Sequence, residues 1–158
     1  MSVTEHLYLD KQHPALWRAI SGLGLKVQEA AEAAGLGTGL LELLNVRISQ
    51  INGCAYCLVM HTNDARKQGE TDDRMHLLNA WREAPVFSER ERAALAWAEA
   101  ITLVAEGHVP DDVYEAALRQ FSEKELVDLT LATVAINGWN RLAIAFRATP
   151  QVKSAKAA

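Results

Sequence analysis

The sequence predicts an all-α protein of a single domain, residues 1–158, with about seven helices. Three observations support this fold class. The chain has 158 residues, which suits one domain with one buried core. Ala, Leu, Glu and Arg dominate, and apolar residues do not alternate with polar ones over a useful length, so strand signals are almost absent. Glycines, prolines and capping residues then divide the chain at intervals that suit helices.

The N-terminal half of the chain divides into four predicted helices. Pro14 suits the first turn of the first helix, and the segment GLGTG ends that helix. The pair Asn52–Gly53 is a turn signal between the second and third helices. Thr71 can cap the fourth, which has two acids in its first turn. The predicted helices cover residues 14–34, 38–52, 54–69 and 71–84.

Two capping boxes organise the C-terminal half. Ser88 with Glu91 opens one helix, and Ser122 with Glu125 opens the last one. A shorter helix follows Pro110 between them. The predicted helices cover residues 88–106, 110–121 and 122–147, and we expect the tail, 148–158, to be frayed.

The last predicted helix is apolar nearly all the way round, although it contains Asn137, Asn140 and Arg141. These polar residues and Asp128 argue against a membrane span. An apolar helix must be covered on every side, either as the central helix of the core or within a subunit interface. The sequence leaves both open, and we expect a homo-oligomer. The pattern does not assign partners to Asn140 and Arg141.

The composition excludes several classes of partner. The net charge is −4 without a basic cluster, which argues against nucleic acid. Polar and charged residues occupy the first positions, where a secretion signal needs an apolar stretch. We therefore expect a cytoplasmic protein. Thiols stay reduced in that compartment, so a pair of cysteines is more readily catalytic or metal-binding than structural.

The stretch NGCAYCLVMHTNDA contains both cysteines of the chain. Cys54 and Cys57 are three residues apart, which places them on one face at the start of a helix, close enough for a disulfide. His61 follows Cys57 by four residues and lies on the same face one turn further. An imidazole in that position can take the proton of the Cys57 thiol, because its pKa lies near neutral pH.

A fourth residue follows from the geometry of a helical hairpin. If the second and third helices fold back at Asn52–Gly53, Glu42 and His61 differ in height by roughly 3 Å at about 1.5 Å per residue. Glu42 lies among four leucines, where a carboxylate either faces outward or is buried for a reason. Facing the third helix, it can orient His61 and extend a proton relay from Cys57.

These four residues carry a resemblance to a known family. Glu42, eleven residues, Cys54, two residues, Cys57, three residues and His61 resemble the signature of the alkylhydroperoxidase D (AhpD) family, within the carboxymuconolactone decarboxylase superfamily. The segments RISQINGCAYCLVMHTNDARKQGE, WREAPVFSERERAALAWAEA and NGWNRLAIAFR are similar as well. The resemblance covers roughly His13 to Arg147 and implies a helical bundle with the Cys-x-x-Cys at the start of a central helix.

The resemblance implies a role for each residue. Cys57 is the peroxidatic cysteine that attacks a hydroperoxide and becomes a sulfenic acid, and Cys54 condenses with it to a disulfide. His61 and Glu42 relay protons. A dithiol, in some members a lipoylated protein, reduces the disulfide, and no cofactor or metal is required. Family members assemble as trimers or hexamers.

Two features complicate these assignments. The helix dipole favours a thiolate at Cys54, by about 0.3–1 kcal/mol, whereas His61 favours Cys57. A positioned base contributes about 10²–10⁴-fold to the chemical step, so we assign the attack to Cys57. Some relatives have a second histidine before this cysteine, where the chain has Tyr56. A tyrosine donates a hydrogen bond but carries no charge near neutral pH, so the relay is leaner.

Other interpretations of the site remain open. The cysteines could be small core residues. They could also bind zinc with His61 and Glu42, although a structural zinc site usually takes a second Cys or His pair, and none is evident. The alternative functions are a dithiol oxidoreductase that does not use peroxides, a decarboxylase-type relative, and a redox-sensing helical oligomer that binds partners. The decarboxylases proper lack the cysteine pair, which counts against that alternative.

Overall fold

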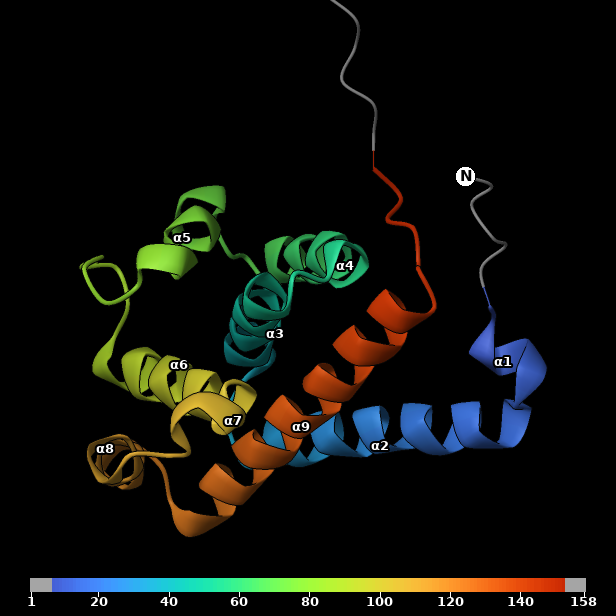
Figure 1. The fold of residues 1–158 in the computed structure, drawn as a ribbon. Coiled ribbons are helices and arrows are strands. Elements are labelled where there is room, and N and C mark those ends of the chain that lie inside the picture. The colour runs from blue at the N-terminus through green and yellow to red at the C-terminus, as the bar shows by residue number, and fades with distance from the viewer. Residues whose placement is uncertain (1–6, 153–158) are drawn as a thin grey trace, which may run out of the picture.

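The computed structural model describes residues 7–152, and every regular element within that range is helical, as the sequence predicts (Figure 1). The first six and the last six residues, which include most of the predicted frayed tail, lie outside the described range. The α-helices are α1 (Leu9–Gln12), α2 (Pro14–Ala33), α3 (Thr38–Asn52), α4 (Ala55–Lys67), α5 (Asp72–Leu77), α6 (Glu89–Thr102), α7 (Val104–Gly107), α8 (Asp111–Gln120) and α9 (Glu123–Ala145). A 3₁₀ turn, η1 (Leu78–Ala80), follows α5.

Helix α3 lies at the centre of the described fold and contacts α4, α6 and α9 (Figure 1). Helix α2 packs along α9, and α1 lies at its N-terminal end. Figure 1 shows α5, α6 and α8 on the side of α3 that is opposite to α1 and the N-terminal end of α2. The side chains of the core come mainly from α3, η1, α6 and α9, and the most deeply buried large ones are Leu43, Ile48, Leu78, Leu95 and Leu129.

The helix starts follow the sequence signals closely. Both predicted capping boxes are present: Ser88 caps α6 with Glu91, and Ser122 caps α9 with Glu125. Thr71 accepts the N–H of Arg74 and caps α5. Such caps satisfy backbone N–H groups that have no partner within the helix, which is why they fix where a helix begins.

The helix ends differ from the prediction at three places. The helix predicted over 88–106 is interrupted at Leu103, which separates α6 from the short helix α7. Thr102 precedes the break, and its hydroxyl donates to Ala98 O and accepts a hydrogen bond from Asn137. The helix predicted over 71–84 tightens into η1 after Leu77, and α9 ends at Ala145. Together with the short α1, these breaks raise the count in the described residues above seven.

A buried ion-pair cluster fixes α3 against α6. The Glu99 carboxylate accepts hydrogen bonds from Arg47 Nε at 2.7 Å and Trp81 Nε1 at 2.8 Å, and it pairs with Arg82 at 2.7 Å. Burial opposes ionisation of this carboxyl group. The three donors outweigh burial, so the pKa of Glu99 lies below its ordinary value.

Helix α9 is only partly covered within this chain. It contacts α2, α3, α4, α6 and α8. Val127, Leu131 and Val134 lie on one face of the helix and are about half exposed. Helix α2 also exposes Leu16 and Leu23. One face of the last helix therefore packs in the core of this chain, and another face remains uncovered.

None of the helices in the described part of the chain is long and apolar enough to cross a membrane.

The acid stability of the fold should depend on Glu125. The backbone N–H of Ser122 and then the guanidinium of Arg90 lower the pKa of Glu125 to about 2. Because the unfolded carboxyl has a pKa of about 4.3, the stabilisation is complete above that pH and is lost as the pH falls towards about 2. We expect Glu125→Gln to reduce the pH dependence of the unfolding free energy between pH about 4.3 and 2. Urea titrations at several pH values would measure it.

Glu115→Gln is the matched control, since Glu115 is an exposed carboxylate on α8. An equal loss of pH dependence in both variants would contradict the role assigned to Glu125.

Candidate functional site

The site begins with a left-handed turn between α3 and α4. Gly53 has φ 68°, a conformation that costs glycine least. Its N–H bonds Gln50 O at 3.3 Å, and the N–H of Cys54 bonds Ser49 O at 3.0 Å. These two bonds form a Schellman motif, which ends α3 and places Cys54 directly at the start of the next helix.

Cys54 is the N-cap residue of α4, one position before the first-turn place that the sequence predicts. Its sulfur accepts the N–H of Cys57 at 3.3 Å. The sulfur therefore occupies the place of a capping oxygen at the positive end of the helix. Cys54 and Cys57 form a disulfide with Cα atoms 5.3 Å apart, and both residues are almost fully buried.

The hairpin brings Glu42 on α3 against His61 on α4, as the helical arithmetic predicts. Glu42 Oε2 and His61 Nδ1 are 2.7 Å apart, and both side chains are largely buried. This hydrogen bond orients the imidazole ring, so that Nε2 faces away from Glu42. His61 Nε2 is buried and has no hydrogen-bond partner in residues 7–152. An unpaired buried nitrogen of this kind is costly in a purely structural residue and is available for proton transfer.

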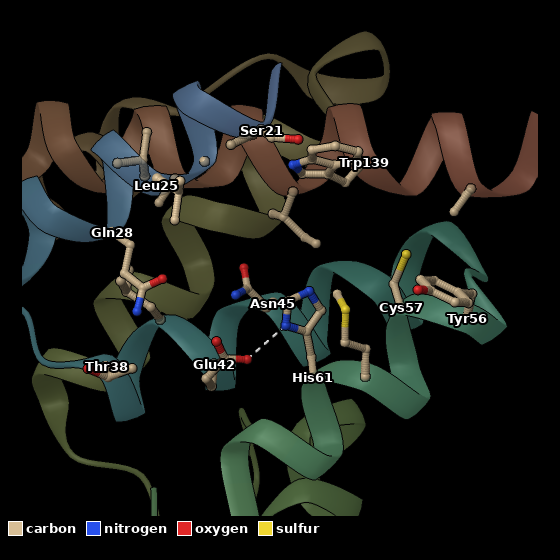
Figure 2. A pocket seen from close by; sticks show the side chains of 18 of the residues that line it. Ser21, Leu25, Gln28, Thr38, Glu42, Asn45, Tyr56, Cys57, His61 and Trp139 are labelled. Atoms are coloured by element: carbon tan, nitrogen blue, oxygen red, sulfur yellow. Dashed lines mark hydrogen bonds and ion pairs between the residues drawn. The ribbon is translucent and has the colours of Figure 1, made fainter. Parts of the chain in front are cut away.

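Cys57, His61 and Glu42 line one pocket of about 500 Å³. Figure 2 shows the three side chains around this space, with His61 and Cys57 projecting from α4 and Glu42 from α3. Cys54 is not among the lining residues. The pocket therefore distinguishes the two cysteines, because the sulfur of Cys57 shares a cavity with the histidine.

The rest of the pocket is mainly apolar. Its large apolar lining residues come from α2, α3, α4 and α9, and they are Trp17, Leu25, Leu41, Met60, Ile136 and Trp139. Trp17 and Trp139 meet edge to face with ring centroids 5.1 Å apart. The pair joins the N-terminal half of α2 to α9 and closes one wall. The position of these tryptophans in the pocket depends on a contact between helices that lie far apart in the sequence.

A polar network in α9 holds the turn that carries Cys54. Asn140 is completely buried, donates to Ser49 Oγ at 3.1 Å and accepts from Asn52 Nδ2 at 2.9 Å. Asn52 also donates to Asn137 Oδ1 at 3.0 Å. The last turn of α3 is thus bound to the middle of α9. The polar residues within an apolar helix were the sequence signal for this network, and their partners required the fold.

Arg141 belongs to the edge of the same network. Its guanidinium donates to the backbone oxygen and the side-chain oxygen of Asn137, each at 2.9 Å. Both hydrogen bonds lie within α9 and join residues one turn apart. Arg141 therefore supports Asn137, and through it Asn52.

Tyr56 lies between the two cysteines in the sequence and is partly exposed. It lines the pocket together with Cys57 and His61 (Figure 2). The hydroxyl of this residue can donate a hydrogen bond to a ligand but cannot supply a second imidazole.

The residues proposed for zinc do not form a four-ligand set in this oxidation state. The sulfur atoms of Cys54 and Cys57 are bonded to each other, so they are not thiolate ligands. Within the described range, ligand atoms of Glu42, His61 and Asp64 lie within 4.8 Å of one another. Asp64 also pairs with Lys67 at 2.6 Å, and the carboxylate of Glu42 already holds His61.

The fold and the site define a class of protein: an all-helical domain with a Cys-x-x-Cys disulfide beside a glutamate–histidine pair. The sequence profile of the carboxymuconolactone decarboxylase family matches residues 14–100, more than half of the chain. The chain belongs to this family, and within it to the AhpD-like proteins.

Two relatives and one further solved structure are similar to this chain. The chain is 48% identical over 104 residues to the uncharacterized protein YdfG of Bacillus subtilis, covering 66% of this chain and 71% of YdfG. A solved structure from Agrobacterium tumefaciens, of a protein of unknown function described as a candidate antioxidant defence protein AhpD, is 37% identical with TM-score 0.86. That match covers 95% of this chain and 100% of the other.

The debrominase Bmp8 shares the fold with TM-score 0.76 at 21% identity, over 89% of this chain and 74% of Bmp8. At this identity the likeness to Bmp8 shows a shared fold, and the reaction has to be argued from the site of this chain.

The polar network gives a stability prediction. Asn140→Leu removes a partner of the buried Ser49 and of the partly buried Asn52 on α3, so we expect a loss of about 1–3 kcal/mol in the unfolding free energy. Chemical denaturation would measure this loss. Asn63→Leu on the exposed side of α4 is the matched control, with an expected change within about 0.5 kcal/mol. Equal changes in the two variants would contradict the role of the network.

Proposed function

We propose that the protein is a thiol-dependent peroxidase that reduces hydroperoxides. The observation that carries this proposal is the placement of Cys57 in one pocket with the hydrogen-bonded pair Glu42–His61. The description of the Agrobacterium relative as a candidate antioxidant defence protein agrees with it. The cycle begins with both cysteines reduced.

The ionised carboxylate of Glu42 accepts the Nδ1–H of His61, which leaves Nε2 as the proton acceptor. His61 takes the proton of the Cys57 thiol, and the thiolate attacks the outer oxygen of the hydroperoxide. The O–O bond breaks, the alcohol leaves with the proton held by His61, and Cys57 becomes a sulfenic acid. The Cys54 thiol then attacks this sulfur, water leaves, and the disulfide forms.

The assignment of the attack to Cys57 rests on the pocket as well as on the base. The N-cap position of Cys54 favours a thiolate there, by about 0.3–1 kcal/mol. Cys54 does not line the pocket that contains His61, whereas Cys57 does. A peroxide in that pocket therefore meets Cys57 and the histidine together, and Cys54 acts as the resolving residue.

Two electrons must return from a dithiol reductant, and we propose a small dithiol or a lipoylated protein for this step. We further propose a homo-oligomer, a trimer or hexamer, that works in the cytoplasm. The exposed face of α9 at Val127, Leu131 and Val134 supports the oligomer, since an apolar stripe of this kind suits a subunit interface. Size-exclusion chromatography with light scattering tests it, and a monomer at micromolar concentration would contradict it.

Peroxidase turnover is the direct test of the proposed function. Reduced protein mixed with cumene hydroperoxide and dihydrolipoamide should consume many equivalents of peroxide per subunit. The loss of free thiols and of peroxide would be followed together. A redox sensor would consume about one equivalent and stop. Cysteines that stay reduced under excess peroxide would overturn the proposal, and would favour a dithiol oxidoreductase that does not use peroxides.

Glu42 is a positioning residue in this scheme, because it acts through His61. We expect Glu42→Gln to lower the rate of thiol oxidation by about tenfold or more and to change its pH profile, because the amide cannot stabilise a charged imidazole. Stopped-flow thiol oxidation from pH 5 to pH 9 would measure both.

Glu29→Gln, at an exposed ion pair on α2, is the matched control and should keep the rate and the profile of the unmodified protein. If the rate of Glu42→Gln falls only in proportion to a loss of folded protein, Glu42 has no part in the relay.

A further inference from the structure

A second hollow lies on the other cysteine. It has a volume of about 380 Å³, and its lining includes Cys54 but not Cys57. Tyr56 and Ala143 line both this hollow and the first pocket, so they form the wall between the two spaces. The disulfide thus presents one sulfur-bearing residue to each space: Cys57 to the pocket with His61, and Cys54 to the second hollow.

The end of α9 shapes this hollow. Arg147 takes a left-handed conformation with φ 55°, its N–H bonds Ile144 O at 3.1 Å, and the N–H of Ala148 bonds Ala143 O at 2.8 Å. This is a Schellman motif, in which glycine is the usual left-handed residue. The chain then turns back to line the hollow up to Pro150.

Small side chains account for the empty space. Gly53 and Ala55 border Cys54 on one side, and Ala143 and Ala148 approach it from α9 and the segment that follows. No acidic residue is among the described lining residues, so none of them repels a thiolate as it approaches. The hollow therefore suits a slender thiol-bearing arm.

The choice of the sulfur that the reductant attacks determines which cysteine leaves as the thiolate. A thiolate that attacks a disulfide sulfur expels the other sulfur as the leaving thiolate. Attack on Cys54 expels Cys57 into the pocket where His61 can return a proton to it. Attack on Cys57 would have to enter the peroxide pocket and would expel Cys54 away from the histidine. The hydrogen bond from the Cys57 N–H would favour Cys54 as a leaving group, but it supplies no mobile proton.

We propose that the second hollow is the entry site for the reductant, a dithiol on a slender arm, which attacks Cys54. The S–S bond breaks, a mixed disulfide forms between the reductant and Cys54, and Cys57 leaves as a thiolate that His61 protonates. The second thiol of the reductant then attacks its own sulfur in the mixed disulfide. Cys54 leaves as a thiolate, and the reductant departs as a cyclic disulfide, oxidised by two electrons.

This inference rests on the proposed function only for the cycle as a whole, and its first test uses no peroxide. Oxidised protein is mixed with 2-mercaptoethanol, which cannot cyclise, and the reaction is quenched early with acid and then alkylated. Fragmentation mass spectrometry of the peptide with both cysteines should find the mixed disulfide on Cys54 and the alkyl group on Cys57. The reverse pattern would overturn the inference. If peroxide fails to oxidise the cysteines, the proposed function is overturned, but the mass spectrum still identifies the cysteine that the reductant attacks.

A second test separates the two spaces by filling them. Ala148→Trp fills the hollow and should lower the rate of disulfide reduction by dihydrolipoamide about tenfold relative to the rate of thiol oxidation by cumene hydroperoxide. Leu25→Trp, at the first pocket, should change this ratio in the opposite direction. Ala33→Trp lines neither space and is exposed, so both rates should stay within about twofold of the unmodified protein. Equal ratios in all three variants would contradict separate entry sites.

Discussion

The left-handed turn at Gly53 is the constraint on which the site depends. It ends α3, makes Cys54 the cap of α4, and folds the two helices back so that Glu42 meets His61. A residue with a Cβ is strained in this conformation, and a slip of one position would move both cysteines to another face of α4. The arrangement of the two cysteines, His61 and Glu42 is thus set by a few backbone hydrogen bonds at this turn.

Helix α9 combines two demands that usually conflict. Its apolar side chains pack in the core and line the first pocket, while Asn137 and Asn140 form buried hydrogen bonds with the end of α3. Buried amides are costly unless they are satisfied, and here each finds partners on another helix. The same helix ends beside Cys54. One element therefore contacts the turn, the first pocket and the second hollow.

Much of the fold could be predicted because its signals are local. Capping boxes at Ser88 and Ser122 mark helix starts within a few residues, and the spacing of Glu42 and His61 follows from the rise of a helix. The break at Leu103 could not be predicted, because it coincides with a hydrogen bond between Thr102 and the distant Asn137. The N-cap position of Cys54 was missed by one residue, since it depends on whether Gly53 ends α3 or enters α4.

The shape of the pocket could not be read from the sequence for a similar reason. Trp17 and Trp139 are more than a hundred positions apart and meet only when α2 packs on α9. Both residues are apolar, but the sequence does not indicate that they border a cavity. The partners of Asn140, which are Ser49 and Asn52, could not be predicted either, because they lie on a helix far away in the sequence. In this protein, the residues to which we assign chemical roles lie close together in the sequence, whereas the residues that form the walls of the pocket lie far apart in it.

Trapping of the sulfenic acid tests the central claim most directly, because it identifies the sulfur that meets the peroxide. Cys54→Ser and Cys57→Ser would each be reduced, treated with one equivalent of cumene hydroperoxide in the presence of dimedone, and analysed by mass spectrometry. The account predicts a dimedone adduct on Cys57 in Cys54→Ser and almost none in Cys57→Ser. An adduct on Cys54 in Cys57→Ser, with Cys57 unlabelled in the other variant, would contradict it.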